Sequence, residues 1–209
     1  MAQVKKAAIR ERILDAAFRQ FRERGYAATT ISTIAAEAGV STANVYVYFP
    51  SKFRIVRELY DAWFRARIER LRGDAEAIGE PRARVFAVLH ALWCEIPGED
   101  NGFANCFMEA ISTLGPDEEY DIGLLRWAEA QVGGMLRDAL PDADLVAPVR
   151  IARIALMAFD GFAIGRKLRP VAECDHATID QMTALLLHER PPPRRRAGAR
   201  RAARTEERP

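Results

Sequence analysis

Residues 30–49 read TISTIAAEAGVSTANVYVYF. Thr30 and Ser41 each stand directly before a short apolar-periodic segment, where a side-chain oxygen can cap the first turn of a helix. Gly39, between the two segments, can adopt the left-handed backbone that turns the chain. The pattern predicts two short helices joined by a tight turn. In such a helix-turn-helix the second helix can enter a DNA major groove about 12 Å wide.

The second of these helices divides its residues between an inner and an outer side. The apolar side chains of the two short helices would pack against the first helix of the chain: Ile34, Ala38, Val40, Val45 and Tyr48. The positions that flank them point outward: Thr42, Ala43, Asn44 and Val47. An asparagine amide can pair with adenine, and methyl groups suit the thymine methyl. The alternative interpretation is an ordinary helical hairpin that contacts no nucleic acid.

Helical periodicity continues along nearly all of the chain, and no segment alternates like a strand. The sequence therefore predicts an all-α protein of about nine helices. We expect three units: a three-helix DNA-binding head over residues 1–52, a larger helical body over 53–190, and a disordered Arg/Pro-rich tail over 191–209. We expect the first helix to end at Gly25 and a helix of the body to end at Pro97-Gly98. Three more helices are expected over roughly 117–140, 144–168 and 174–189.

Charge is unevenly distributed along the chain. Residues 1–52 hold eight lysines and arginines against four acidic residues, a net +4, whereas residues 53–190 hold sixteen against twenty-three, a net −7. Residues 191–209 hold seven arginines against two glutamates, a net +5. A basic segment attracts a polyanion such as DNA, although many solvated surfaces are equally uneven.

Membrane and secreted classes are disfavoured. No apolar run reaches the roughly 18 uncharged residues that span a bilayer, and the N-terminus has no signal-peptide core. The three cysteines, Cys94, Cys106 and Cys174, are odd in number and far apart, which argues against a disulfide framework or a zinc site. We expect a cytoplasmic protein with no membrane partner.

Catalytic chemistry has little support in the sequence. His90, His176 and His188 are isolated from one another, and no GxSxG, HExxH or phosphate-loop pattern is present. The expectation is a protein that is not an enzyme and that needs neither a cofactor nor a metal.

A longer run of residues surrounds the helix-turn-helix without a gap, over about residues 9–53. Its members are Ile13-Leu14-Asp15-Ala16-Ala17, Phe21, Gly25-Tyr26, Thr29-Thr30-Ile31, Ile34-Ala35, Ala38-Gly39-Val40-Ser41, Tyr46, Tyr48-Phe49 and Ser51-Lys52. This run resembles the DNA-binding head of the tetracycline-repressor (TetR) family, and it covers about a quarter of the chain. The resemblance implies a homodimeric regulator that binds a pseudo-palindromic double-stranded DNA operator and responds to a small-molecule effector.

The resemblance also implies roles for individual residues of the head. Tyr46 and Lys52 would contact DNA phosphates, with Thr30 and Ser32 assisting at the start of the first helix of the pair. A packed aromatic ring and a solvated charge are the alternative interpretations of Tyr46 and Lys52.

Two features of the body bear on the homodimer and the effector. The segment 144–168 is apolar almost all round, so it needs cover on more than one side. The resemblance makes it, with the last helix, the dimer interface; burial within the monomer is the alternative. The candidate effector-pocket residues are mostly large aromatic ones, which can equally fill a core: Trp63, Trp93, Phe103, Phe107, Trp127, Phe159 and Asp160.

Asp160 is the polar member of that set. It lies on an apolar stripe of its helix, so we expect it to be protonated, hydrogen-bonded or paired, with Arg153 and Lys167 as candidate partners. A carboxylate that holds helices together and a polar anchor for an effector are both compatible with this position.

Two other hypotheses stand beside a repressor that its effector releases from DNA. An architectural DNA-binding protein would bind any duplex, with the arginine-rich tail adding a steep salt dependence. A helical ligand-binding or enzymatic bundle with a vestigial head would bind no operator at all.

Overall fold

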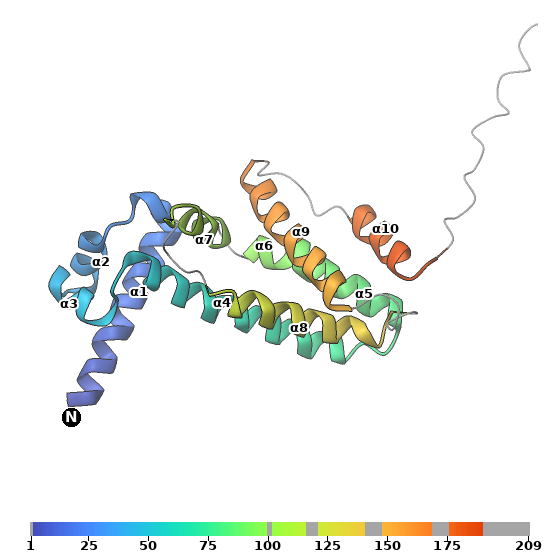
Figure 1. Ribbon diagram of the computed structural model, residues 1–209, viewed down its shortest axis with the longest axis horizontal. Coiled ribbons are helices and arrows are strands. Elements are labelled where there is room, and N and C mark those ends of the chain that lie inside the picture. Colours follow the sequence, from blue (N-terminus) through green and yellow to red (C-terminus); the bar gives the residue numbers. More distant parts are fainter. Residues whose placement is uncertain (1, 100–101, 116–120, 141–147, 169–175, 190–209) are drawn as a thin grey trace, which may run out of the picture.

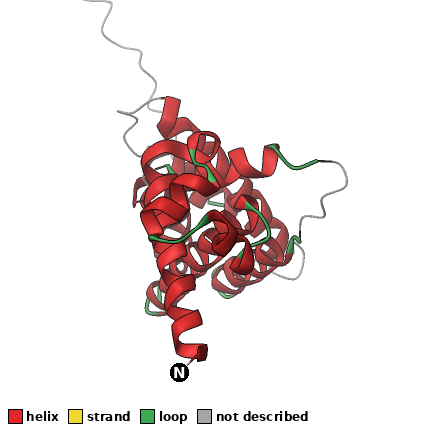
Figure 2. Ribbon diagram, turned by 90° about the vertical axis from the view of Figure 1, so that its left-hand side faces the viewer, coloured by secondary structure: helices red, strands yellow, loops and turns green. Residues whose placement is uncertain are grey.

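The computed structural model describes residues 2–99, 102–115, 121–140, 148–168 and 176–189. These residues form helices and connecting turns with no strand among them, which confirms the all-α prediction (Figure 2). The elements, in chain order, are α1 (Ala2–Ala28), α2 (Ile31–Ala38), α3 (Thr42–Tyr48), α4 (Lys52–Glu76), α5 (Pro81–His90), the π-helical segment η1 (Ala91–Glu95), α6 (Ile96–Glu99), α7 (Phe103–Ser112), α8 (Gly123–Arg137), α9 (Pro148–Leu168) and α10 (His176–Leu186). Because α5, η1 and α6 are continuous, the described residues make nine helical rods.

The head consists of α1, α2 and α3, and it lies at one end of the molecule (Figure 1). The backbone of α1 leaves the helical region at Gly25, where φ is +77°, as the sequence predicted for the end of the first helix. Only a residue without a Cβ adopts this conformation at little cost. The three residues after Gly25 then redirect the chain toward α2.

The body is built around α4, which runs from the head along the length of the molecule (Figure 1). α8 packs along α4, and α9 packs on α8 and η1. α10 packs on α5 at the far end, and α7 joins the body to α1. The expected segments 117–140, 144–168 and 174–189 therefore correspond to α8, α9 and α10, although residues 117–120, 144–147 and 174–175, like the tail, lie outside the described residues.

The expectation that Pro97-Gly98 ends a helix is wrong. α6 continues through Pro97 to Glu99, directly after η1. The amide of Ile96 bonds to the carbonyl of Ala91, five residues back, so the chain is wider here than in an α-helix. A proline ring clashes with the carbonyl four residues before it only when the regular α-helical spacing is kept. The π-helical turn thus admits the proline without breaking the rod.

Cys94, within η1, also departs from the sequence-based expectation. It is disulfide-bonded, and its partner lies outside the described residues. Cys106 is a free thiol in the core. The argument against a disulfide is therefore wrong for Cys94, and the cysteine pattern no longer supports the expected cytoplasmic location. None of the described helices is both long enough and apolar enough to cross a membrane.

Gly133 is where α8 meets the start of α9. A Cβ built on Gly133 would lie 3.2 Å from the Cα and the nitrogen of Val149, whereas a Cβ on Gly134 would meet nothing within 4 Å. We expect Gly133→Ala to lower the free energy of unfolding by about 1 kcal/mol, because overpacking costs more than the helix propensity gained.

Gly134→Ala is the matched control for this substitution. It adds the same methyl group in open space and should stabilise the chain by up to about 1 kcal/mol. Thermal unfolding of the two variants measures the difference, and equal melting temperatures would contradict the close approach of α9 at Gly133.

Candidate functional site

The helix-turn-helix is fixed by local hydrogen bonds. The Thr30 hydroxyl accepts from the Thr33 amide at 3.2 Å, and the Thr33 hydroxyl accepts from the Thr30 amide at 3.1 Å, which forms a capping box. Gly39 ends α2 in the left-handed region, with φ of +66°. The Ser41 hydroxyl then accepts from the Asn44 amide at 3.1 Å to start α3. The two predicted caps and the predicted turn glycine are confirmed.

α3 presents most of its side chains to solvent. Val45 is fully buried and anchors the helix, while Val40 and Tyr48 are only partly buried. Tyr46 and Val47 are 55% and 67% exposed. The other predicted DNA-contacting residues of α2 and α3 are exposed or partly exposed: Thr30, Ser32, Thr42, Ala43 and Asn44. This surface has small and polar side chains with no acidic residue among them.

Three charged side chains of the head hold α2 against α1. Arg12 donates to the carbonyls of Ala38 and Gly39, at 3.2 Å for the second, and so caps the C-terminal end of α2. Arg19 pairs with Glu37 at 2.5 Å, and this hydrogen bond holds the pKa of Glu37 below its usual range. The orientation of α3 therefore depends on α1 through fixed bonds as well as through the apolar core.

Lys52 has an internal role that the sequence did not reveal. Its ammonium donates to the carbonyl of Tyr26 at 2.7 Å and to that of Thr29 at 2.8 Å, and it lies 4.0 Å from the centroid of the Tyr26 ring. Burial lowers the pKa of Lys52. Two of its three donors are thus used to close the end of α1, where carbonyl groups lack helical partners. The predicted phosphate contact must compete with these bonds.

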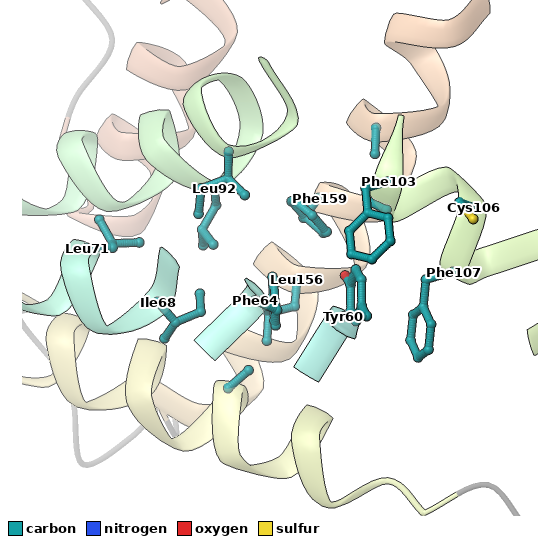
Figure 3. Close-up of a cluster of buried hydrophobic side chains, with 14 of the residues drawn as sticks. Tyr60, Phe64, Ile68, Leu71, Leu92, Phe103, Cys106, Phe107, Leu156 and Phe159 are labelled. Atoms are coloured by element: carbon teal, nitrogen blue, oxygen red, sulfur yellow. The ribbon is translucent and has the colours of Figure 1, made fainter. Parts of the chain in front are cut away.

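A cavity of about 170 Å³ lies between α4, α7, α8 and α9. Aromatic rings form much of its wall: the Tyr60 and Phe107 rings stack with centroids 4.0 Å apart, and Phe64 packs on Phe159 at 5.5 Å (Figure 3). The described residues that line it are Tyr60, Phe64, Phe107, Met108, Ile111, Leu124, Leu125, Leu156, Phe159 and Asp160.

The cavity contains three of the seven predicted pocket residues, Phe107, Phe159 and Asp160. Phe103 and Trp93 are instead buried in the core, where the Trp93 indole donates to the carbonyl of Ala155 at 2.9 Å. Sequence reasoning missed the other described lining residues, because neither aliphatic nor aromatic side chains carry a signal that separates a cavity wall from a core: Tyr60, Phe64, Met108, Ile111, Leu124, Leu125 and Leu156.

Trp63 and Trp127 also lie outside this cavity. Each indole is partly buried and is covered by an arginine side chain: Arg67 lies 5.3 Å from the Trp63 ring, and Arg65 lies 4.4 Å from the Trp127 ring. Both tryptophans thus form part of the surface layer of the body rather than the wall of the cavity.

Asp160 differs from its expected state. The residue as a whole is exposed, but its carboxyl group is partly buried, and Arg153 pairs with Glu129 instead, at 2.8 and 3.0 Å. Lys167 lies outside the residues whose side chains are described. The apolar walls around Asp160 remove much of its hydration and raise its pKa from 3.8 to about 6.

α7 connects the cavity to the head. Its residues Phe107, Met108 and Ile111 line the cavity, while Glu109 reaches the head. A Glu109 carboxylate oxygen accepts a hydrogen bond from the backbone amide of Tyr26 at 3.2 Å, at the bend of α1. Nothing in the sequence predicted this contact between residues 83 positions apart.

α9 presents an apolar stripe to solvent. The exposed positions recur at intervals of three and four residues: Ile154, Met157, Gly161, Ile164 and Leu168. Ile154 and Met157 are 62% and 67% exposed. An exposed stripe with this spacing matches the seam along which two helices pack.

Residues 13–59 match the family described as "Bacterial regulatory proteins, tetR family". The head of this chain is therefore similar to that family. The HTH-type transcriptional regulator BetI of Rhizobium meliloti (strain 1021) is 39% identical over 84 residues, which make up 38% of this chain and 39% of that protein. The chain therefore spans well under two thirds of the length of curated relatives such as BetI.

Solved structures share the fold of this chain over most of its length. A TetR transcription regulator from Haloarcula marismortui has a TM-score of 0.64 at 23% identity, covering 87% of this chain and 97% of that one. FadR from Bacillus subtilis, in complex with stearoyl-CoA, has a TM-score of 0.60 at 18% identity, covering 85% and 97%. At these identities the likeness shows that the body shares the fold of tetR-family regulators.

Proposed function

We propose that the chain is a sequence-specific DNA-binding transcriptional regulator. The observation that carries this proposal is the tetR-family head, whose α3 leaves a non-acidic surface exposed while its inner side is anchored by Val45. The residues assigned to DNA are Thr30, Ser32, Thr42, Ala43, Asn44, Tyr46 and Val47. Asn44, Ala43 and Val47 have side chains suited to base edges, and Tyr46 suits a phosphate.

The division of labour proposed for the chain follows its elements. Residues 1–52 bind DNA, and residues 53–190 bind an effector and form the dimer. The expected tail, residues 191–209, lies outside the described residues. The curated relatives are transcriptional regulators, and a regulator that acts on bacterial DNA works in the cytoplasm without catalysing a reaction.

A second copy of the chain is the proposed partner along α9. The apolar stripe of α9 would be covered in a symmetric homodimer. Two heads would then read half-sites about 34–36 Å apart, so the operator should be pseudo-palindromic.

Regulation by an effector is proposed from the position of α7. A molecule in the cavity contacts Phe107, Met108 and Ile111, and the same helix holds the bend of α1 through Glu109. If the occupied cavity favours another position of α7, the population shifts toward dimers whose heads do not match the operator spacing. The chain would then act as a repressor that its effector releases.

Selection of duplexes from a random DNA library by the purified chain tests the proposal. A regulator should enrich one pseudo-palindromic sequence. An architectural DNA-binding protein, the alternative function, would enrich none and would bind all duplexes with the same steep salt dependence.

Asn44→Ala tests direct base reading. Asn44 is partly exposed. Its backbone amide donates a hydrogen bond to the Ser41 hydroxyl, and alanine at position 44 retains this bond. We expect a loss on the order of 2 kcal/mol on the selected duplex, with relaxed preference at one or two base pairs. Fluorescence anisotropy on selected and random duplexes measures the effect. An equal loss on both duplexes would contradict the base-reading role.

A further inference from the structure

The cavity in the body combines apolar walls with one carboxylate. Nine of its ten lining residues are aromatic or aliphatic, and the tenth is Asp160. The polar atoms that the lining side chains offer are therefore the Asp160 carboxylate and the Tyr60 hydroxyl. Among the residues that the structure describes, no lysine, arginine or histidine lines this cavity.

Asp160 has no cationic partner among the described residues. Arg153, its nearest expected partner along α9, is bound to Glu129, and the pKa of Asp160 is shifted by burial alone, without a charge–charge contribution. Even after that shift, most of the carboxylate is ionised at neutral pH. A negative charge at an apolar wall is poorly hydrated, so a bound cation would stabilise it.

The aromatic walls favour the same kind of ligand. Tyr60, Phe107 and Phe64 form a stack with neighbouring centroids 4.0 and 5.5 Å apart, and aromatic faces attract cations. A cavity of about 170 Å³ is close to the roughly 150 Å³ apolar cavity that holds one benzene molecule. The space thus suits an apolar group about the size of one ring.

We propose that this cavity binds an organic ammonium ion, with its apolar part among Tyr60, Phe64 and Phe107 and its charged nitrogen at Asp160. The inference rests on the proposed function, because it names the chemical class of the effector. It also separates this chain from FadR of Bacillus subtilis, which was crystallised with stearoyl-CoA. An anionic ligand would face the Asp160 carboxylate, and none of the described lining residues is a cation that offsets the repulsion.

Three compounds with the same ring and different charge test the proposal: benzylamine, benzyl alcohol and benzoate. Isothermal titration calorimetry of the full-length chain at pH 7.5 should give a Kd for benzylamine at least about tenfold lower than for benzyl alcohol, with benzoate weakest. Asp160→Asn should weaken benzylamine by about tenfold and change benzyl alcohol by less than about twofold. Met108→Ala, in the same wall, should weaken both neutral and charged compounds alike.

The pH dependence of binding provides an independent readout. Protonation of Asp160 removes its charge, so benzylamine should bind about tenfold more weakly at pH 5 than at pH 7, as the ionised fraction falls from about 0.9 to about 0.1. Among the described lining residues, the other titratable group is Tyr60 of α4, while α7 and α8 contribute Phe107, Met108, Ile111, Leu124 and Leu125. Asp160→Asn should abolish the pH dependence.

The outcomes divide as follows. Equal affinity for benzylamine and benzyl alcohol, no binding of either, or an unchanged benzylamine Kd in Asp160→Asn overturns the proposal. A variant that loses the dimer in sedimentation yet keeps its benzylamine affinity also overturns it, and assigns Asp160 to packing. The regulator function is judged separately by duplex selection without any compound, so enrichment of an operator together with no charge preference rejects the ammonium ligand alone.

Discussion

Ile154→Glu combined with Met157→Glu is expected to leave the chain monomeric at micromolar concentration. The two side chains are 62% and 67% exposed on α9, so glutamate at either position is solvated in the isolated chain. In a symmetric dimer the same two positions occur twice. Each apolar side chain that is no longer buried at the interface weakens the free energy of association by about 1.5 kcal/mol or more. Four such losses weaken the dimer Kd by at least about 10⁴-fold, before the cost of burying carboxylates is added.

Sedimentation velocity of the wild-type and double-variant chains measures this effect. Ile122→Glu is the control, because Ile122 is an exposed apolar side chain outside α9, at the start of α8. The control should stay dimeric with the wild-type melting temperature. A double variant that sediments as a dimer, or a wild-type chain that is a monomer, would contradict the interface. Loss of the dimer should also abolish tight operator binding, because two linked heads gain affinity that one head lacks.

The parts of the fold that were predictable are those determined by neighbouring residues. Thr30, Gly39 and Ser41 act within one helical turn of their own positions, so the caps and the turn were evident from spacing alone. The same holds for the exposed side of α3, because burial of Val45 fixes where the adjacent side chains point. Local hydrogen bonds and helical periodicity carry enough information for these features.

The features that were missed depend on residues far apart in the chain. Arg153 was expected beside Asp160 on its own helix, but α8 brings a buried Glu129 to it, and this contact frees the Asp160 carboxylate. Likewise, the wall of the cavity depends on which aliphatic side chains of α7 and α8 meet α4. Neither periodicity nor composition encodes which helices pack on each other. The π-helical turn η1, which accommodates Pro97, is likewise a backbone change that no residue type predicts.

Lys52→Met is expected to lower the free energy of unfolding by about 3 kcal/mol, and the melting temperature by about 6–12 °C. Methionine keeps the apolar stem but removes the ammonium that donates to the carbonyls of Tyr26 and Thr29. Hydrogen bonds from a charged donor contribute more to stability than neutral ones do. Because Lys52 is partly exposed, the two bonds together contribute less than they would if fully buried. The bend of α1 would loosen where Glu109 also holds it.

Arg54→Met is the matched control for the Lys52 prediction. Arg54 lies in the same first turn of α4 with an exposed side chain, and its backbone amide bond to Ser51 survives the substitution. It should leave the melting temperature unchanged and, if it lies near a phosphate, lower the salt slope of DNA binding by about one. Lys52→Met should instead lower the melting temperature and change the salt slope of DNA binding by less than about half a unit. If Lys52→Met instead unfolds at the wild-type temperature and loses a full unit of slope, Lys52 binds phosphate and its bonds to α1 contribute little to the fold.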